Sequence, residues 1–314
     1  MTASLRALDA GHYSVLLAES IEGLAIKPEG IYIDATFGRG GHSRAILNQL
    51  SDKGRLIAID QDPAAIDYAS AHFVEHNFKI IHASFAKLED IATELGVLGQ
   101  VDGVLLDLGV SSPQLDEAER GFSFMREGPL DMRMNPNEGI SAKDWLQEVD
   151  EKTLALVLKN YGEERFAFKI ARAVSHDARL GLINTTRDLA ELIERVSPKK
   201  EKNKHAATRS FQAIRIHINQ ELEVLKTVLE ASVKVLAPDG RLSVISFHSL
   251  EDRIVKHFMR DQSRVKDLFP GLPVFIAGSE PVLKVMGKPC FPSEQECDEN
   301  PRSRSAVLRI AQRI

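Results

Sequence analysis

One stretch of the chain reads Asp34-Ala-Thr-Phe-Gly38-Arg-Gly40-Gly41-His42, and it decides the fold. The apolar run Ile31–Ile33 precedes it, and the residues after His42 alternate polar and apolar side chains with helical spacing. A strand, a glycine-rich turn and a helix in this order build a nucleotide-type pocket, because the turn lets the backbone approach a ligand closely. A second apolar run ends at Asp60, where a carboxylate can accept both hydroxyls of a ribose. The two runs together predict a site for an adenosine-containing cofactor.

Two classes of enzyme fit this pocket. A dinucleotide-binding oxidoreductase would show the pattern G-x-G-x-x-G/A, but Ser43 stands at the third position. An S-adenosylmethionine site uses an acid at the end of the first strand to hold the methionine part of the cofactor, and Asp34 is placed for that role. Alternatively, Asp34 and His42 only cap the turn and the start of the helix. We favour the methyltransferase interpretation.

Bulk properties agree with this interpretation without proving it. A chain of 314 residues is long enough for one large domain with an insertion. Its net charge of −5 argues against a protein coated in basic groups, although local basic clusters can still bind RNA. The two cysteines, Cys290 and Cys297, lack zinc-site spacing, and no cluster of metal ligands is evident. Without a long apolar N-terminal segment we expect a soluble, cytoplasmic protein that does not bind membranes.

Strands and helices alternate up to residue 108. Short apolar runs bounded by turn signals are typical of strands in a parallel sheet, whose ligands bind at the carboxyl ends of the strands. The expected strands span 31–36, 55–60, 78–83 and 101–108. This topology predicts that one edge of the sheet carries Asp34, Asp60, Phe85 and Asp107.

The pattern changes after residue 108. Amphipathic stretches without a convincing strand fill 111–213, and a strongly strand-like run at 241–247 then resumes the sheet. We therefore predict a discontinuous methyltransferase domain, residues 1–112 and 214–314, with an inserted helical substrate-recognition domain at 113–213. A closing antiparallel hairpin is expected for a methyltransferase, whereas a dinucleotide fold would add another parallel crossover.

A second chemical site follows the fourth strand, in the segment that runs from Leu105 to Asp116. Amino-methyltransferases often place an Asn/Asp-Pro-Pro-aromatic motif here to bind the hydrogens of the acceptor amine, and this chain lacks that motif. Ser111 and Ser112, with the rigid Pro113, can supply comparable hydroxyls, and Asp107 can face the cofactor or the acceptor. An ordinary serine-rich turn is the alternative.

At this point the chain resembles a known family, the bacterial small-subunit (16S) ribosomal RNA cytosine-N4 methyltransferases of the MraW/RsmH type. The resemblance covers nearly the whole chain and departs only slightly from the family pattern, at Ala206 and Ser210. The segments that carry it are 12–19, 34–42, 106–116, 119–125, 129–134, 161–166, 207–216, 246–253 and 301–305.

This resemblance implies a class I S-adenosylmethionine-dependent methyltransferase with a Rossmann-like sheet and an inserted helical domain. It implies methylation of the exocyclic N4 of a specific cytidine in the decoding region of small-subunit ribosomal RNA. The expected partner is an assembled or nearly assembled small-subunit particle. The cofactor contacts that carry over are Gly40, Gly41, His42, Asp60, Phe85, Asp107 and Gln114. Reasoning from the residues agrees on the first four and on Asp107, and Phe85 is either a platform for adenine or a core aromatic.

The chemistry needs alignment, close approach and a dry pocket, because the sulfonium methyl is already electrophilic. We expect Ser111 and Ser112 to bind the amine hydrogens. His248 is the candidate to take the leaving proton, with a purely structural role as the alternative. The target cytosine must leave its stack to reach this depth. A homodimer is compatible with the sequence.

Basic residues are expected to contact the RNA, although most charge runs are only solvated faces. Three aromatic or apolar residues of one loop are candidates for stacking on bases or for core packing: Phe122, Phe124 and Met125. The basic candidates are Lys199, Lys200, Lys202, Lys204, Arg209, Arg126, Arg133, Arg302, Arg304 and Arg309.

Overall fold

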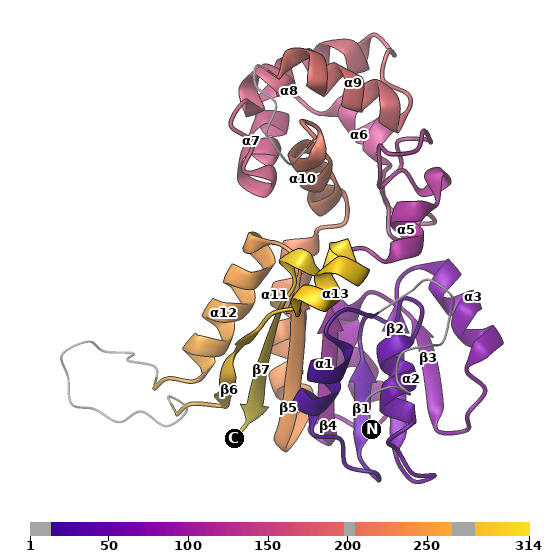
Figure 1. Ribbon diagram of the computed structural model, residues 1–314, viewed down its shortest axis with the longest axis vertical. Helices are drawn as coiled ribbons and strands as arrows, with labels where there is room; N and C mark the ends of the chain where they lie inside the picture. The colour runs from indigo at the N-terminus through magenta and orange to yellow at the C-terminus, as the bar shows by residue number, and fades with distance from the viewer. Residues whose placement is uncertain (1–13, 198–204, 266–279) are drawn as a thin grey trace. The chain divides into compact units, whose positions relative to one another are not determined.

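The chain folds into two compact units, shown in Figure 1. The computed structural model describes residues 14–197, 205–265 and 280–314. The units are Met1–Gly109 with Leu222–Ile314, and Val110–Glu221. The second unit extends beyond the predicted 113–213 because helix α10 (Thr208–Ile218) belongs wholly to it, packing Phe211 and Ile214 into its core.

A seven-stranded sheet lies at the centre of the first unit, in the order β3-β2-β1-β4-β5-β7-β6. Strands β1 to β5 are parallel, whereas β7 is antiparallel to both β5 and β6. The predicted α/β sheet and its closing antiparallel hairpin are therefore confirmed. The strands are β1 (Ile31–Asp34), β2 (Arg55–Asp60), β3 (Phe78–His82), β4 (Val101–Asp107), β5 (Leu236–Ser246), β6 (Leu283–Cys290) and β7 (Val307–Arg313).

Strand β5 begins earlier than the sequence pattern indicates. Pro238-Asp-Gly240 reads as a turn before a strand at 241–247, but pairing with β4 already starts at Leu236. The register shifts between Val101 and Gly103, so the Pro-Asp-Gly segment is accommodated as an irregularity inside the strand. Asp239 takes a left-handed backbone conformation there, with φ 65°.

Alternating side chains of the central strands supply two separate cores. On β4, Val104 and Leu106 pack with helices α4, α11 and α12, whereas Leu105 packs with α1, α2 and α3. The strand period of two thus buries both faces of the sheet. The helices are α1 (Leu17–Leu24), α2 (Gly41–Leu47), α3 (Pro63–His72), α4 (Leu88–Glu94), α11 (Glu221–Val235), α12 (Ser249–Gln262) and α13 (Glu294–Glu299), with 3-10 turns η1 (Phe85–Lys87) and η3 (Pro301–Ser305).

The second unit is helical, with its own apolar core. Leu146, Leu158, Ile170 and Ile193 are buried there, each from a different helix. In the described part of this unit, the strand-type backbone pairing is limited to an isolated bridge between Pro129 and Thr185. The sequence pattern likewise predicts no strand here. Its helices are α5 (Ser112–Asp116), α6 (Ala142–Glu148), α7 (Glu151–Gly162), α8 (Ala167–Arg179), α9 (Thr186–Val196) and α10, with the 3-10 turn η2 (Ala118–Arg120).

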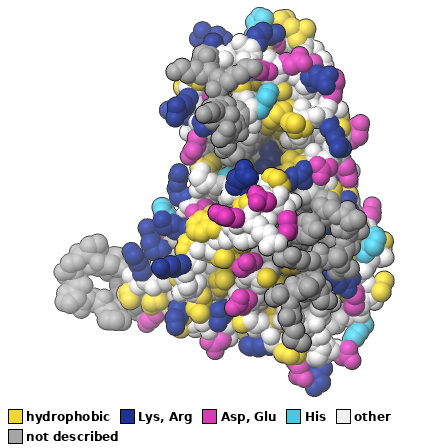
Figure 2. All heavy atoms as spheres, viewed as in Figure 1, with side chains coloured by type: hydrophobic (Ala, Val, Ile, Leu, Met, Phe, Trp, Pro, Cys, Tyr) yellow, Lys and Arg dark blue, Asp and Glu magenta, His cyan; other side chains and the backbone are white. Residues whose placement is uncertain are grey.

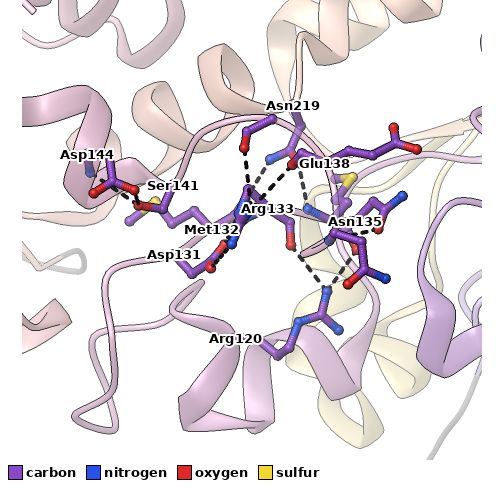
Figure 3. Close-up of polar contacts among 12 residues, drawn as sticks. Arg120, Asp131, Met132, Arg133, Asn135, Glu138, Ser141, Asp144 and Asn219 are labelled. Carbon is purple, nitrogen blue, oxygen red and sulfur yellow. Dashed lines mark hydrogen bonds and ion pairs between the residues drawn. The ribbon is translucent and has the colours of Figure 1, made fainter. Parts of the chain in front are cut away.

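Polar contacts hold the long irregular loop between η2 and α6, as Figure 3 shows. Arg120 donates from its guanidinium to the carbonyls of Arg133 and Met134, at 3.2 and 2.9 Å. Asn219 accepts from Met134 N at 2.7 Å and donates to Met132 O at 2.8 Å. Side chains thus satisfy backbone groups that no helix or strand satisfies in this loop.

Within the residues that the structure describes, no helix combines the length and the apolar character needed to span a membrane.

Candidate cofactor and methyl-transfer site

Three carboxylates lie at the ends of neighbouring parallel strands. Asp34 ends β1, Asp60 ends β2 and Asp107 ends β4. Since β1 lies between β2 and β4, the three side chains leave the sheet at the same carboxyl edge. Parallel α/β sheets bind their ligands at this edge. The topology therefore brings together the acids that the sequence analysis selected.

Asp34 fixes the glycine-rich turn. Its carboxylate accepts from Ser43 Oγ at 2.7 Å and from Thr36 N at 3.1 Å. The side chain is 1% exposed, and burial raises its pKa above the usual value. Part of the role of Asp34 is thus structural, because it joins β1 to the first turn of α2.

The two glycines of the turn are required by the packing of the protein itself. Gly40 has φ 73°, and a Cβ there would collide with the rings of Phe37 and Phe73. A Cβ on Gly41 would collide with Ser14 Oγ. A glycine-rich turn that admits a ligand is thus also a turn that admits these side chains.

Asp60 is oriented by backbone donors. Gly38 N donates to Oδ2 at 2.7 Å and Asp62 N donates to Oδ1 at 2.9 Å. Burial nevertheless raises the pKa of Asp60 to about 6, since desolvation of the charge outweighs these two bonds. Each oxygen keeps a second lone pair, which is what a pair of ribose hydroxyls needs.

His42 is buried and neutral. Its Nε2 lies 3.2 Å from Val15 O, and its Nδ1 lies 3.6 Å from Asp107 Oδ2. Burial lowers its pKa to about 4, because the charged imidazolium would be desolvated. A carbonyl partner places the ring hydrogen on Nε2, so Nδ1 presents a lone pair toward Asp107.

The carboxylate of Asp107 has the fewest hydrogen bonds to offset the cost of burying its charge. Burial, followed by the charges of Asp34 and Glu251, raises its pKa well above the usual value. Its Oδ1 is buried without a hydrogen-bond partner. Among the described residues, no lysine or arginine pairs with Asp34, Asp60 or Asp107, so the pocket is rich in acceptors and lacks cations of its own. A ligand that carries positive charge and donor groups fits this set.

Phe85 opens η1, directly after β3. Ser84 caps that turn by accepting from Ala86 N. The ring is half-buried and packs against the apolar core that contains α4 and α11. The structure therefore includes Phe85 in a core without deciding whether the ring also meets a ligand.

Ser111, Ser112 and Gln114 belong to the second unit, where they start α5. Ser111 Oγ accepts from Gln114 N at 3.4 Å, and Gln114 Oε1 accepts from Ser111 N at 3.0 Å. This reciprocal pair is a capping box. It gives Ser111 and Gln114 a helix-starting role that sequence reasoning missed, although the spacing Ser-x-x-Gln is a known signal for it.

His248 caps α12 after β5. Its Nδ1 accepts from Glu251 N at 3.4 Å, and its Nε2 lies 3.2 Å from Glu251 Oε1. Glu251 in turn accepts from Phe247 N at 2.8 Å and is buried. Sequence reasoning missed Glu251, and it also missed Thr36, whose Oγ1 accepts from Asp107 N at 2.7 Å.

Several predicted RNA contacts have other roles in the structure. Arg133 pairs with Asp131 at 2.7 Å, and Arg309 pairs with Asp252 at 2.7 Å. The lysines at 199, 200, 202 and 204 lie outside the described residues.

The three residues proposed for base stacking also differ in their positions: two belong to the core and one is exposed. Phe122 is buried and Phe124 packs edge-on against Phe211, so both are core residues. Met125 is 81% exposed. Arg126, Arg302 and Arg304 are also exposed.

Comparisons with known proteins place the chain in a family. The family described as the MraW methylase family matches residues 9–314. Ribosomal RNA small subunit methyltransferase H of Hydrogenovibrio crunogenus is 65% identical over 97% of both chains. Its namesake in Idiomarina loihiensis is 58% identical over 96% of this chain and 97% of its own. A crystallised rRNA methylase from Streptococcus thermophilus aligns over 96% of this chain and 99% of its own, with 12% identity and a TM-score of 0.43. The chain therefore belongs to the MraW methylase family, and its methyl donor is S-adenosylmethionine.

Proposed function

We propose that this protein methylates the exocyclic N4 of one cytidine in the decoding region of small-subunit ribosomal RNA. The names of its relatives support the RNA class, and the resemblance to cytosine-N4 methyltransferases supports the acceptor atom. The observation that carries the proposal is the set of Asp34, which is buried, and Asp60 and Asp107, which are half-buried; among the described residues no lysine or arginine pairs with them, and Asp107 Oδ1 has no hydrogen-bond partner.

S-adenosylmethionine supplies a sulfonium-bound methyl carbon that is electrophilic from the start. We assign Asp34 and Asp107 to its cationic part and Asp60 to its ribose hydroxyls. His42 offers the Nδ1 lone pair as a further acceptor. The remaining proposed contacts are the backbone of Gly40 and Gly41, the ring of Phe85 and the amide of Gln114.

The acceptor amine is a poor nucleophile, because its lone pair is delocalised into the ring. Ser111 and Ser112 are proposed to accept its hydrogens and so raise the electron density on nitrogen. His248 is proposed to relay the leaving proton. Its Nδ1 accepts from Glu251 N through a long 3.4 Å hydrogen bond, which protonation of Nδ1 would break, while Nε2 lies 3.2 Å from Glu251 Oε1 without a hydrogen bond.

One incubation tests the function. Small ribosomal subunits from a strain that lacks this protein are mixed with it and with methyl-labelled S-adenosylmethionine, and the RNA is digested to nucleosides. We expect label in N4-methylcytidine at a single position. Label in another nucleoside would overturn the assignment to N4, and no label in free RNA, assembly intermediates or finished subunits would overturn the reaction.

A further inference from the structure

Helix α12 turns a basic face to solvent. Its opposite side is apolar, with Val255 and Met259 buried against the sheet. The exposed cationic positions recur every three or four residues and end just beyond the helix, and Figure 2 shows dark blue side chains gathered over α12. They are Arg253, Lys256, His257, Arg260 and Arg264.

The other helices on the sheet do not share this character. The exposed charges of α11 are mixed, with Glu223 and Glu230 beside Lys226 and Lys234. Helix α4 exposes Asp90 and Glu94 and no cation. An ordinary solvated face carries both signs, as α11 does. In a chain of net charge −5, the face of α12 is a local concentration of positive charge.

The acids of α12 neutralise this face only in part. Glu251 is buried at the start of the helix, and Asp252 pairs with Arg309 of β7 at 2.7 Å. Asp261 is the exposed acid of the helix, and it pairs with its neighbour Arg260. Lys256 has no ion pair or hydrogen bond among the described residues.

The face also starts at the functional edge of the sheet. Helix α12 follows β5, which is the parallel neighbour of β4 and of its terminal Asp107. At 1.5 Å per residue, the seven steps from Arg253 to Arg260 cover about 10 Å, with about one cation per turn of 5.4 Å, and Arg264 follows just beyond the helix. A row of this spacing matches successive phosphates of an extended nucleic-acid strand better than a single point ligand.

We propose that this basic face of α12 binds the phosphate backbone of the RNA chain next to the target nucleotide, an inference that rests on the proposed function. The exposed positions of α12 include no large apolar side chain, whereas protein–protein interfaces are anchored by aromatic and apolar groups. The chemistry of the face therefore favours a polyanion over a folded protein partner.

Matched triple variants test this. K256Q/R260Q/R264Q removes three charges from the face, and R55Q/K79Q/K226Q removes three exposed charges from β2, β3 and α11. Binding to protein-free small-subunit ribosomal RNA is measured at several salt concentrations, together with methylation kinetics, S-adenosylmethionine affinity and thermal unfolding. Each phosphate contact contributes about 0.7–0.9 to the slope of log K against log salt.

The α12 variant should lose about 2 in that slope and bind RNA roughly 10- to 100-fold more weakly at low salt, with a raised KM, an unchanged kcat and unchanged cofactor affinity. The control variant should match the wild type. Equal slopes for the two variants would overturn the inference, and so would a loss confined to assembled subunits, which would indicate an acidic protein partner. Methylation of subunits by the wild type supports the proposed function whatever these variants do. If the wild type does not methylate subunits, that result contradicts the proposed function itself.

Discussion

Two groups at the glycine-rich turn, His42 within it and Asp60 bonded to it, respond to burial in opposite ways. The pKa of Asp60 is raised to about 6, so between pH 3.8 and 6 the folded chain holds a proton that the unfolded chain has released. That contribution to stability therefore falls as pH rises. The pKa of His42 is lowered to about 4, so between pH 4 and 6.5 the unfolded chain holds the extra proton, and this contribution rises with pH.

When one of the two groups is replaced, the pH dependence of the free energy of unfolding should show the contribution of the other. For Asp60→Asn, the free energy of unfolding should rise more steeply than in the wild type between pH 4 and 6.5, by about 2 kcal/mol in total. For His42→Asn, the free energy of unfolding should rise less with pH than in the wild type over the same range. Urea unfolding at half-unit steps of pH measures both, and a profile of Asp60→Asn parallel to the wild type would show that the carboxyl titrates normally.

The two serines at the start of α5 allow a capping role to be distinguished from a catalytic one. Ser111→Ala should lower the free energy of unfolding by about 1 kcal/mol because the capping box is lost. Ser112→Ala should leave stability unchanged. If both hydroxyls hold the amine, each variant should also lower kcat about 10-fold at unchanged cofactor affinity. Ser111→Gly keeps most of the stability of the helix start without a hydroxyl, so a loss of kcat in Ser111→Ala that Ser111→Gly restores would assign that serine to helix capping alone.

At the scale of elements, hydrophobic pattern predicted most of the fold. The apolar runs at 31–36, 55–60, 78–83 and 101–108 became β1 to β4, because strands buried on both faces have a near-continuous apolar sequence. The helices of the second unit followed from their amphipathic spacing. The start of β5 did not follow, because a Pro-Asp-Gly segment inside a strand depends on the partner strand that tolerates it.

The candidate site was predictable to the extent that topology places strand ends side by side. Asp34, Asp60 and Asp107 were found in this way. The contacts around them were not, because Thr36 and Glu251 act through hydrogen bonds between segments distant in sequence. The capping role of His248 was also hidden, since a histidine is an unusual helix cap.

The loop of Figure 3 depends on one side chain of α10's end. Asn219→Ala removes the hydrogen bonds that its side chain makes with Met134 N and Met132 O. We expect a loss of about 2 kcal/mol in stability and faster hydrogen exchange over 131–142. Asn137→Ala, on an exposed residue of the same loop, is the control. Unchanged exchange in Asn219→Ala would show that Arg120 suffices to hold the loop.

For the whole molecule, the two units have separate cores. The buried residues of the apolar cluster of the second unit lie between Leu130 and Ile214, and the described partly buried residues that pack against them lie between Phe124 and Ile218. A fragment comprising 110–221 should therefore fold alone, with a helical far-ultraviolet circular dichroism spectrum and a cooperative urea transition. A fragment that is helical only in the presence of the remaining chain would contradict this independence.

The carboxylates without basic partners have a consequence for turnover. If Asp107 meets the sulfonium as proposed, loss of the methyl group would leave a neutral thioether there, and this carboxylate would lose the positive charge that stabilised its ionised form. Asp107, with its elevated pKa, then favours reprotonation. On that proposal the acidic cluster attracts the fresh donor more strongly than the used one, so the change of charge at sulfur favours exchange of cofactor between rounds.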